Sequence, residues 1–344
     1  MVDESVPPTP YESILDSAPA EAAERTTSPV DEFVRQIKET ADKLAKDGAG
    51  RGDMKLLASA LKELRYCFKV FAQYRGRRKV TIFGSARTRP DHPAYQTAVA
   101  FAERIAAAGY MVITGAASGI MEAGHVGAGA ADSFGLNILL PFEQQANPVI
   151  LADPKLMNLR YFFTRKLVFI KESDAVVLFP GGFGTHDEAF ETLTLMQTGK
   201  SHIFPIVLVD EPGGDYWRHW QRFVETELLD RGYISPADRA FYKVTDSVEE
   251  AVEEVTNFYC VYHSMRYVRG DLVLRLQRPI TEGTLVQLRT DFADILTGGS
   301  IEQTSALPQE ANEPELRDLP RLRFRFDRVN TGRLRQLIDA VNRD

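Results

Sequence analysis

Cysteine is scarce in this sequence, because only Cys67 and Cys260 occur among its 344 residues. The two lie far apart in helix-like contexts, and neither belongs to a C-x-x-C pair or to a Cys/His spacing that binds zinc. The six histidines show no ligand spacing either. These absences argue against a disulfide framework and give no reason to expect a metal. Both thiols are expected to be reduced, as in a cytoplasmic protein.

Long apolar runs are also missing. No stretch approaches the ~20 apolar residues that cross a bilayer, so no membrane partner is expected. The first residues, MVDESVPPTPYES, are acidic and proline-rich. They lack the basic region and the apolar run of a secretory signal. We therefore expect a cytoplasmic localisation.

An excess of positive charge is absent as well: 41 Lys and Arg stand against 48 Asp and Glu, a formal net charge of −7. Such a chain has no overall basic field, so no nucleic-acid polymer is expected as a partner. The main local exception is RLRFRFDR, residues 321–328. Its alternation of Arg with Leu and Phe predicts an amphipathic strand with one packed and one solvated face.

The order of patterns along the chain predicts four regions. Residues 1–28 are rich in Pro, Ser, Thr, Ala and Glu and are expected to form a disordered tail. Residues 29–75 carry two helical patterns around the break GAGRGD, which predicts a helical hairpin. In residues 76–262 short β-branched runs alternate with helical patterns, and residues 263–344 suggest a small α+β appendage whose role the sequence does not reveal.

The alternating region predicts the fold class. Its runs are apolar throughout, which is typical of parallel strands covered on both faces. We therefore expect an α/β fold with a doubly wound, mainly parallel, Rossmann-like sheet and ligands at the carboxyl ends of its strands. The predicted strands are residues 79–84, 110–115, 136–141, 175–180 and 204–209.

The most specific motif is FPGGFGTHDEAFE, residues 179–191, directly after a predicted strand. A strand, a glycine turn and a helix together form an anion site. Missing Cβ atoms let a ligand approach the backbone of Gly181, Gly182 and Gly184, while unpaired amides at the helix start favour a phosphate. Thr185 is the expected N-cap of the following helix.

The same motif lacks the Lys-Ser/Thr pair of a Walker A loop, so it suits a monophosphate better than a triphosphate. Glu188 lies about one turn into the predicted helix, where a structural acid is also common. His186 and Asp187 are more strongly expected to be structural, since helix neighbours one and two apart do not face one site.

Two other strand ends carry polar residues. FGSARTRP presents Ser85 and Arg87, which either bind a nucleotide or form an ordinary loop. TGAASGIMEAG presents Gly115 and Glu122 but lacks the G-x-G-x-x-G fingerprint of dinucleotide-binding folds. Glu122 is either an acid favoured by the helix dipole or a contact to a ribose or base.

A third segment, MNLRYFFTRKLVFIKESDA (residues 157–175), reads as a helix and feeds the strand before the glycine turn. It carries Arg165 and Lys166 amid apolar neighbours. The two residues are either solvated charges or placed so that one of them approaches the glycine pocket.

Together these motifs resemble the Lonely Guy family of phosphoribohydrolases, often described as lysine decarboxylases, and in particular its longer bacterial branch. The resemblance covers roughly residues 75–260 and runs through FGSAR, TGAASGIMEA, LRYFFTRK, FPGGFGTHDEAFE and LMQTGK. Where short members have G-G-G-x-x-G-L-M-G, this chain has GAASGIMEA. A cytokinin substrate is therefore not implied.

The resemblance implies a Rossmann-like fold and the hydrolysis of a nucleoside 5′-monophosphate to a free base and ribose 5-phosphate. The substrate would be AMP or a related purine nucleotide, with a cytokinin riboside monophosphate as a further candidate. The implied catalytic residues are Arg165 and Glu188. The implied substrate-binding residues are Ser85, Gly115, Glu122, Lys166, Gly181, Gly182, Gly184 and Thr185.

Neither a cofactor nor a metal is expected for this reaction, and the family implies a homodimer or a larger homo-oligomer. One alternative stays open: a carrier or sensor that binds a nucleotide or molybdenum cofactor without turnover. The presence of both Arg165 and Glu188 favours the enzyme. A decarboxylase dependent on pyridoxal phosphate is disfavoured, because no lysine stands in a suitable Schiff-base setting.

Overall fold

The computed structural model describes residues 29–140 and 145–344. The predicted tail, residues 1–28, lies outside them. The chain divides into two compact units between Ser59 and Ala60. The first unit contains helix α2 (Pro29–Lys46) and the start of helix α3 (Arg51–Phe71). The second unit contains everything that follows, including the candidate site.

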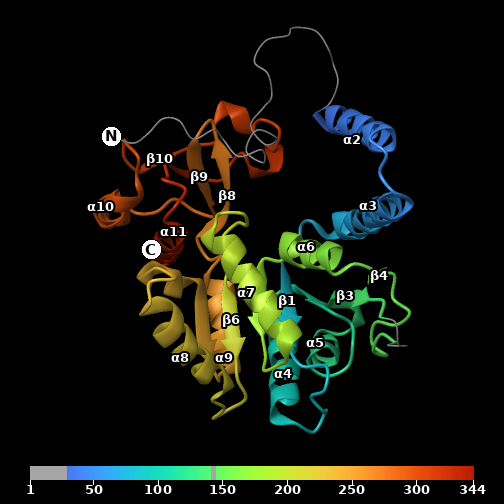
Figure 1. Ribbon diagram of the computed structural model, residues 1–344. Helices are drawn as coiled ribbons and strands as arrows, with labels where there is room; N and C mark the ends of the chain where they lie inside the picture. The colour runs from blue at the N-terminus through green and yellow to red at the C-terminus, as the bar shows by residue number, and fades with distance from the viewer. Residues whose placement is uncertain (1–28, 141–144) are drawn as a thin grey trace. The chain divides into compact units, whose positions relative to one another are not determined.

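The second unit is built on a seven-stranded sheet whose strands all run parallel, which confirms the predicted fold class (Figure 1). The strand order is β4-β3-β2-β1-β5-β6-β7. The chain thus builds outward from β1 to β4 and then returns to the other side of β1. The strands are β1 (Lys79–Phe83), β2 (Met111–Thr114), β3 (Ser133–Ile138), β4 (Leu156–Leu159), β5 (Ala175–Leu178), β6 (Ile206–Val209) and β7 (Tyr242–Thr245).

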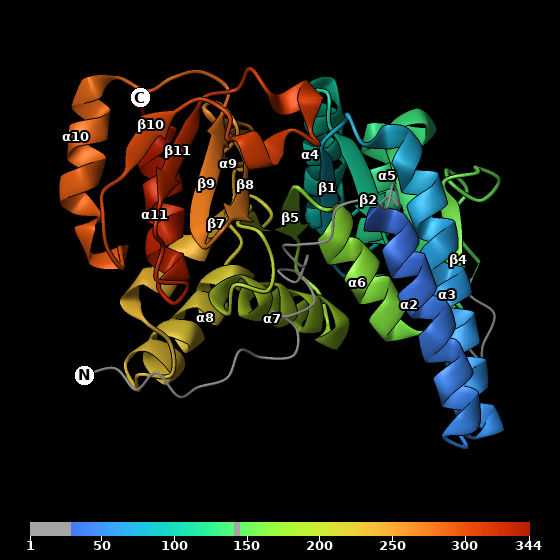
Figure 2. The same cartoon turned by 90° about the horizontal axis from the view of Figure 1, so that it is seen from above.

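Helices cover both faces of this sheet. Successive side chains of a strand point to opposite faces, so Val80 and Ile82 of β1 pack with α4, α5 and α9, while Phe83 joins the core under α6, α7 and α8. Figure 2 shows α4 and α6 on opposite sides of β1. The helices are α4 (Pro93–Ala107), α5 (Ile120–Ala128), α6 (Phe162–Glu172), α7 (Phe183–Gln197), α8 (Tyr216–Phe223) and α9 (Val248–Asn257).

Two strands were missed from the sequence. The expectation of a helix from Met157 is wrong at its start, because Leu156–Leu159 form β4 and α6 begins only at Phe162. A four-residue apolar run does not distinguish a strand from a helix, and pairing with β3 decides the matter here. The short strand β7 was not predicted at all.

The N-cap prediction for Thr185 is also wrong. Helix α7 begins at Phe183 with Gly182 as its N-cap, and Thr185 lies inside the first turn. The backbone amides of Thr185 and His186 both donate to the carbonyl of Gly182, at 3.1 and 3.3 Å. The helix start therefore lies closer to the glycines than the sequence suggested.

The C-terminal part forms a second, antiparallel sheet of order β10-β11-β9-β8 with two helices, in agreement with the α+β prediction. These elements are coloured orange to red in Figure 1. They are β8 (Tyr262–Val268), β9 (Asp271–Leu276), α10 (Glu282–Asp291), β10 (Glu302–Thr304), β11 (Arg321–Phe324) and α11 (Thr331–Val341). Short 3₁₀ or π turns occupy Ala72–Tyr74, Ala130–Asp132, Val224–Leu229, Pro236–Phe241, Ala293–Ile295, Pro308–Glu310 and Pro314–Leu316.

The RLRFRFDR segment differs from its prediction in one respect. Arg323 is exposed as expected, but Arg321 is fully buried and pairs with the buried Glu310 at 3.0 Å. Glu310 also pairs with Arg275 of β9, at 2.9 Å. A buried guanidinium is tolerated only with such partners. Arg321 and Arg323 lie on the same face of β11, so the face that was expected to be solvated is covered at Arg321. In the described part of the chain no helix is long and apolar enough to cross a membrane.

Candidate functional site

The candidate site lies at the topological switch point of the sheet, where the strand order reverses. Strand β1 has β2 on one side and β5 on the other. The connections that follow β1 and β5 therefore run in opposite directions, and a crevice forms at the carboxyl ends of these two strands. The amide of Phe179 donates to the carbonyl of Phe83 at 2.9 Å, and that of Ser85 donates to Pro180 at 3.1 Å. The loops after β1 and β5 are therefore joined at their roots.

The loop after β2 is locked onto the same place. Gly119 has φ +69°, and a Cβ there would come within 2.2 Å of the carbonyl oxygen of Ser85. The Ser118 hydroxyl donates to the Ala86 carbonyl at 2.9 Å, and the amide of Ile120 donates to Ser85 at 3.0 Å. The three polar strand ends of the sequence thus form one site, with a glycine required where they touch.

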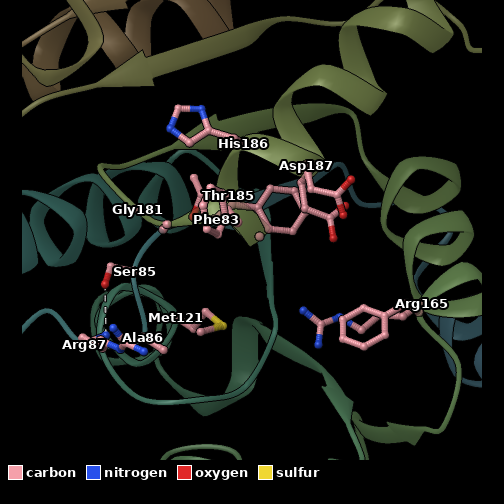
Figure 3. A pocket seen from close by; sticks show the side chains of 16 residues that line it. Phe83, Ser85, Ala86, Arg87, Met121, Arg165, Gly181, Thr185, His186 and Asp187 are labelled. Carbon is pink, nitrogen blue, oxygen red and sulfur yellow. Dashed lines mark hydrogen bonds between the residues drawn. The ribbon is translucent and has the colours of Figure 1, made fainter. Parts of the chain in front are cut away.

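A cavity of about 850 Å³ opens between these loops, α6 and α7 (Figure 3). This volume accommodates a mononucleotide-sized ligand. Five of the predicted substrate-binding residues and both predicted catalytic residues contribute to its wall. The lining consists of Phe83, Gly84, Ser85, Ala86, Arg87, Met121, Phe162, Arg165, Gly181, Gly182, Phe183, Gly184, Thr185, His186, Asp187 and Glu188.

The glycine loop combines a tight contact with open space. A Cβ on Gly181 would lie 2.1 Å from the Thr185 hydroxyl oxygen and 3.0 Å from the Ser85 amide nitrogen, so this position excludes a side chain. A Cβ on Gly182 or Gly184 would meet nothing within 4 Å. The space beside them belongs to the cavity, at the start of α7, where free amides and the helix dipole favour an anion.

A brace that the sequence did not reveal holds this loop. The hydroxyl of Tyr216, the first residue of α8, donates to the carbonyl of Gly181 at 2.5 Å. His186 Nε2 then donates to the Tyr216 oxygen at 2.7 Å. Burial lowers the pKa of His186, and Figure 3 shows its ring turned away from the other labelled side chains. His186 therefore has the structural role predicted for it, through a partner that lies 30 positions along the chain.

Glu188 is the buried acid of the site. Its side chain lies on α7 with 6% exposure, and its Oε2 atom has no hydrogen-bond partner among the residues that the structure describes. Burial raises the pKa of Glu188 to about 7, although Lys166 and Arg165 act in the opposite direction. A carboxyl group with this pKa changes its protonation state near neutral pH.

Arg165 lies on α6 across the cavity, and its guanidinium points toward Met121 (Figure 3). A Cβ on Gly115 would come within 3.2 Å of Arg165 Nη2 and 2.6 Å of Met121 Sδ, so the missing side chain makes room for both. The guanidinium lies 5.3 Å from the ring centroid of Phe169, and within residues 29–140 and 145–344 its Nε atom has no hydrogen-bond partner. Burial lowers the pKa of Arg165, yet an arginine stays protonated at neutral pH.

Three predicted binding residues lie outside the cavity wall. Gly115 contributes through the space it leaves for Arg165. Lys166 of α6 is paired with Asp187 at 2.8 Å and Glu191 at 2.6 Å, which links α6 to α7. Glu122 lies in the first turn of α5, and its neighbour Met121 reaches the wall instead.

The cavity also contains side chains that the sequence analysis did not single out. Met121, Phe162 and Phe183 give it apolar walls, and Phe183 is 96% exposed. An apolar residue between two glycines, as in GGFGT, was the available signal for Phe183. Tyr216 had none, because its contact to the loop is purely tertiary. Among the described residues, no three His, Cys, Asp or Glu side chains gather as metal ligands do.

The fold and the site together define a doubly wound α/β protein with a glycine loop and a cavity at its switch point. Residues 113–255 match the family model described as "Possible lysine decarboxylase". A cytokinin riboside 5′-monophosphate phosphoribohydrolase of Mycobacterium tuberculosis is 40% identical over 89 residues, which are 26% of this chain and 45% of that protein. Through this segment the chain is similar to the Lonely Guy family.

Other curated relatives carry the same name. The protein of Rhodococcoides fascians is 33% identical over 91 residues, covering 26% of this chain and 44% of the relative. One from Arabidopsis thaliana is 32% identical over 94 residues, covering 27% and 42%. The chain thus spans less than half the length of each of these relatives.

Solved structures resemble the chain more weakly. A molybdenum cofactor binding protein from Rippkaea orientalis has a TM-score of 0.37 at 19% identity, over 52% of this chain and 96% of that one. DNA processing protein A from Helicobacter pylori has a TM-score of 0.37 at 14% identity, over 51% and 79%. Likenesses of this size favour no function.

Proposed function

We propose that the chain hydrolyses the N-glycosidic bond of a nucleoside 5′-monophosphate, AMP or a related purine nucleotide, to a free base and ribose 5-phosphate. The observation that carries this proposal is the pairing of a buried, unpartnered carboxyl group with a glycine anion loop in one cavity. The names of the curated relatives agree with this reaction class. Neither the apolar side chain of Met121 nor the GAASGIMEA sequence identifies the preferred base, which experiment must determine.

The phosphate would bind at the start of α7. The space beside Gly182 and Gly184 is open, and among the described residues no side chain caps this helix start. Binding the phosphate supplies energy remote from the reacting bond and holds the ribose in one orientation. A nucleoside without phosphate would lack this anchor and is expected to be a poor substrate.

Glu188 would act on the ribose. Cleavage of the bond from C1′ to the base nitrogen builds positive charge on the sugar, and an ionised carboxylate nearby stabilises that charge. As this bond breaks, the base leaves with the bonding electrons and takes up a proton from solvent. Water adds its oxygen to C1′ and passes one proton to Glu188, which returns that proton to solvent. A group with a pKa near 7 is suited to accept a proton at neutral pH.

Arg165 would complete the site. Its guanidinium favours the ionised form of Glu188, and its unpartnered Nε atom offers a donor to the substrate. Lys166, which does not line the cavity, would favour the ionised form of Glu188 through its positive charge. Self-association into a homodimer or a larger assembly stays a prediction from the family resemblance.

The test is chromatography of free base after incubation of the purified full chain with AMP. We expect adenine from AMP and none from adenosine. Glu188→Gln, which keeps the shape of the side chain, should lower the rate by roughly 10²- to 10⁴-fold while AMP binding, measured by calorimetry, survives. Release of no base from any purine or pyrimidine monophosphate would favour a carrier instead.

Gly182→Ala tests the phosphate loop. The new methyl group meets no protein atom, so the fold should persist, but it occupies space beside the amides that would bind phosphate. We expect AMP affinity to fall at least about tenfold. Gly283→Ala on α10, where a Cβ also fits, is the matched control and should bind AMP as the parent does.

A further inference from the structure

A second cavity, of about 740 Å³, lies at the amino ends of the parallel strands, whereas the candidate site lies at their carboxyl ends. Its walls come from the residues that precede β1, β5 and β6 and from the start of β8 and its surroundings. It thus lies between the parallel sheet and the C-terminal sheet, and ligand sites are common at such junctions. Nothing in the reaction proposed above uses it.

Three arginines of the segment RGRR line this cavity: Arg75, Arg77 and Arg78. Arg78 is held in place, because it donates to Asp174 at 3.0 Å and to the carbonyl of His263 at 3.1 Å. Its guanidinium also lies 3.5 Å from the ring centroid of Tyr259. A planar cation fixed in this way is already oriented for a ligand.

The remaining arginines differ in their partners. Arg77 bonds Asp132 at 2.6 Å and the carbonyls of Gly109 and Tyr110. Arg75 is exposed, and its side chain has no partner in the part of the chain that the structure describes. Among these three arginines of the cavity wall, Arg75 is therefore the one whose hydrogen-bond donors are available to a ligand.

Two carboxylates share the wall, Asp174 and Glu315. Both oxygens of Asp174 are engaged, one by Arg78 and the other by the amide of Lys79 at 2.9 Å. Arg78 is thus paired with Asp174, and Arg77 is paired with Asp132, which lies outside the wall. Among the described residues these pairs leave Arg75 as the guanidinium group of the wall that no carboxylate neutralises.

Two histidines complete the wall, and both are held in the neutral form mainly by burial. Burial, together with the charges of Arg78 and Arg275, lowers the pKa of His263 to about 4. Burial also lowers the pKa of His202. Both rings are neutral at pH 7 and can donate or accept hydrogen bonds beside the fixed guanidinium groups.

We propose that this second cavity binds a small molecule through a phosphate or diphosphate group. Arginine donors in a fork and neutral ring nitrogens match the several oxygens of such an anion, and charge-assisted bonds to it are strong. The volume exceeds that of the anion alone, so the rest of the ligand has room. The site is separate from the glycine loop, and the proposal stands whether or not the proposed reaction does.

The test is calorimetry on the full chain with inorganic pyrophosphate and with ADP as probes. Gly182→Ala serves as the parent, so that binding at the glycine loop is weakened. Into it we place Arg75→Glu and, as a matched control, Arg65→Glu, which reverses an exposed arginine of α3 that does not line the cavity. Circular dichroism verifies that each variant folds.

We expect Arg75→Glu to weaken pyrophosphate binding at least about tenfold and Arg65→Glu to leave it within twofold. Tighter binding of ADP than of pyrophosphate would identify the ligand as a nucleotide, and equal binding would identify the inorganic anion. The proposal is overturned if Arg75→Glu binds both probes as the parent does, or if the control loses as much affinity.

Discussion

Glu188 combines deep burial with an unpaired oxygen and a pKa of about 7. This raised pKa has a cost in stability. In an unfolded chain a glutamate loses its proton near its ordinary pKa of 4.5, whereas the folded chain keeps the proton until about pH 7. The folded state therefore binds more protons between these values, and its stability falls as the pH rises through that window.

Glu188→Gln removes this titration. The variant should gain stability relative to the parent between pH 5 and pH 8, by up to about 3 kcal/mol, since a tenfold change in the proton affinity of one group corresponds to ~1.4 kcal/mol. Urea unfolding at both pH values measures the change. Glu103→Gln, on the exposed side of α4, controls for the loss of one charge. An equal stability difference at pH 5 and pH 8 would contradict the assignment.

At the scale of elements, the site is formed by the ends of neighbouring helices and strands. The start of α7 carries the glycine loop, α6 carries Arg165, and α8 braces the loop through Tyr216. The brace gives the carbonyl of Gly181 a hydrogen-bond donor and so sets the position of the neighbouring glycine. Tyr216 acts on the ligand only through this loop and is a positioning residue.

Tyr216→Phe tests the brace. Loss of the hydroxyl should lower stability by about 0.5–1.5 kcal/mol and raise KM for the nucleotide severalfold, with a smaller change in kcat, because the loop amides shift. Steady-state kinetics and thermal unfolding give both numbers. Tyr242→Phe is the matched control: its hydroxyl is buried without a partner, so its removal should cost nothing. Unchanged KM in Tyr216→Phe would show that the loop holds itself.

At the scale of the molecule, the C-terminal sheet is joined to the parallel sheet in one core. Leu272, Leu274 and Phe324 belong to the same apolar cluster as Met196 and Trp217. Helix α11 also reaches the far end of α7, where the Thr331 hydroxyl donates to the carbonyl of Gln197 at 2.8 Å. Such continuity predicts that residues 60–344 unfold as one cooperative unit.

Gly332 is the closest point of this junction. A Cβ there would lie 2.5 Å from the backbone carbonyl of Ala237, so Gly332→Ala overpacks the contact of α11. We expect a loss of about 1–3 kcal/mol. Calorimetric and circular-dichroism transitions should move together. Gly283→Ala should stay within roughly 0.5 kcal/mol of the parent, the range of a surface change. Separate transitions for the two sheets would refute the single unit.

The amino-acid sequence alone determined the sheet class, its five central strands, the glycine loop and seven of the residues that line the cavity. These depend on local patterns: apolar runs of strand length, glycines at strand ends and helical spacing between them. Where a local pattern was short or ambiguous, prediction failed, as it did for the strand at Met157 and for the N-cap at Thr185.

Only the tertiary structure decided which groups share a wall and which charges are free. The Tyr216 brace, the space that Gly115 leaves for Arg165, and the burial of Arg321 against Glu310 all join residues distant in sequence. Burial and neighbouring charges set a pKa, and neither is written in a local pattern. For this reason the sequence names Glu188 as an acid, while the fold determines at which pH that acid is ionised.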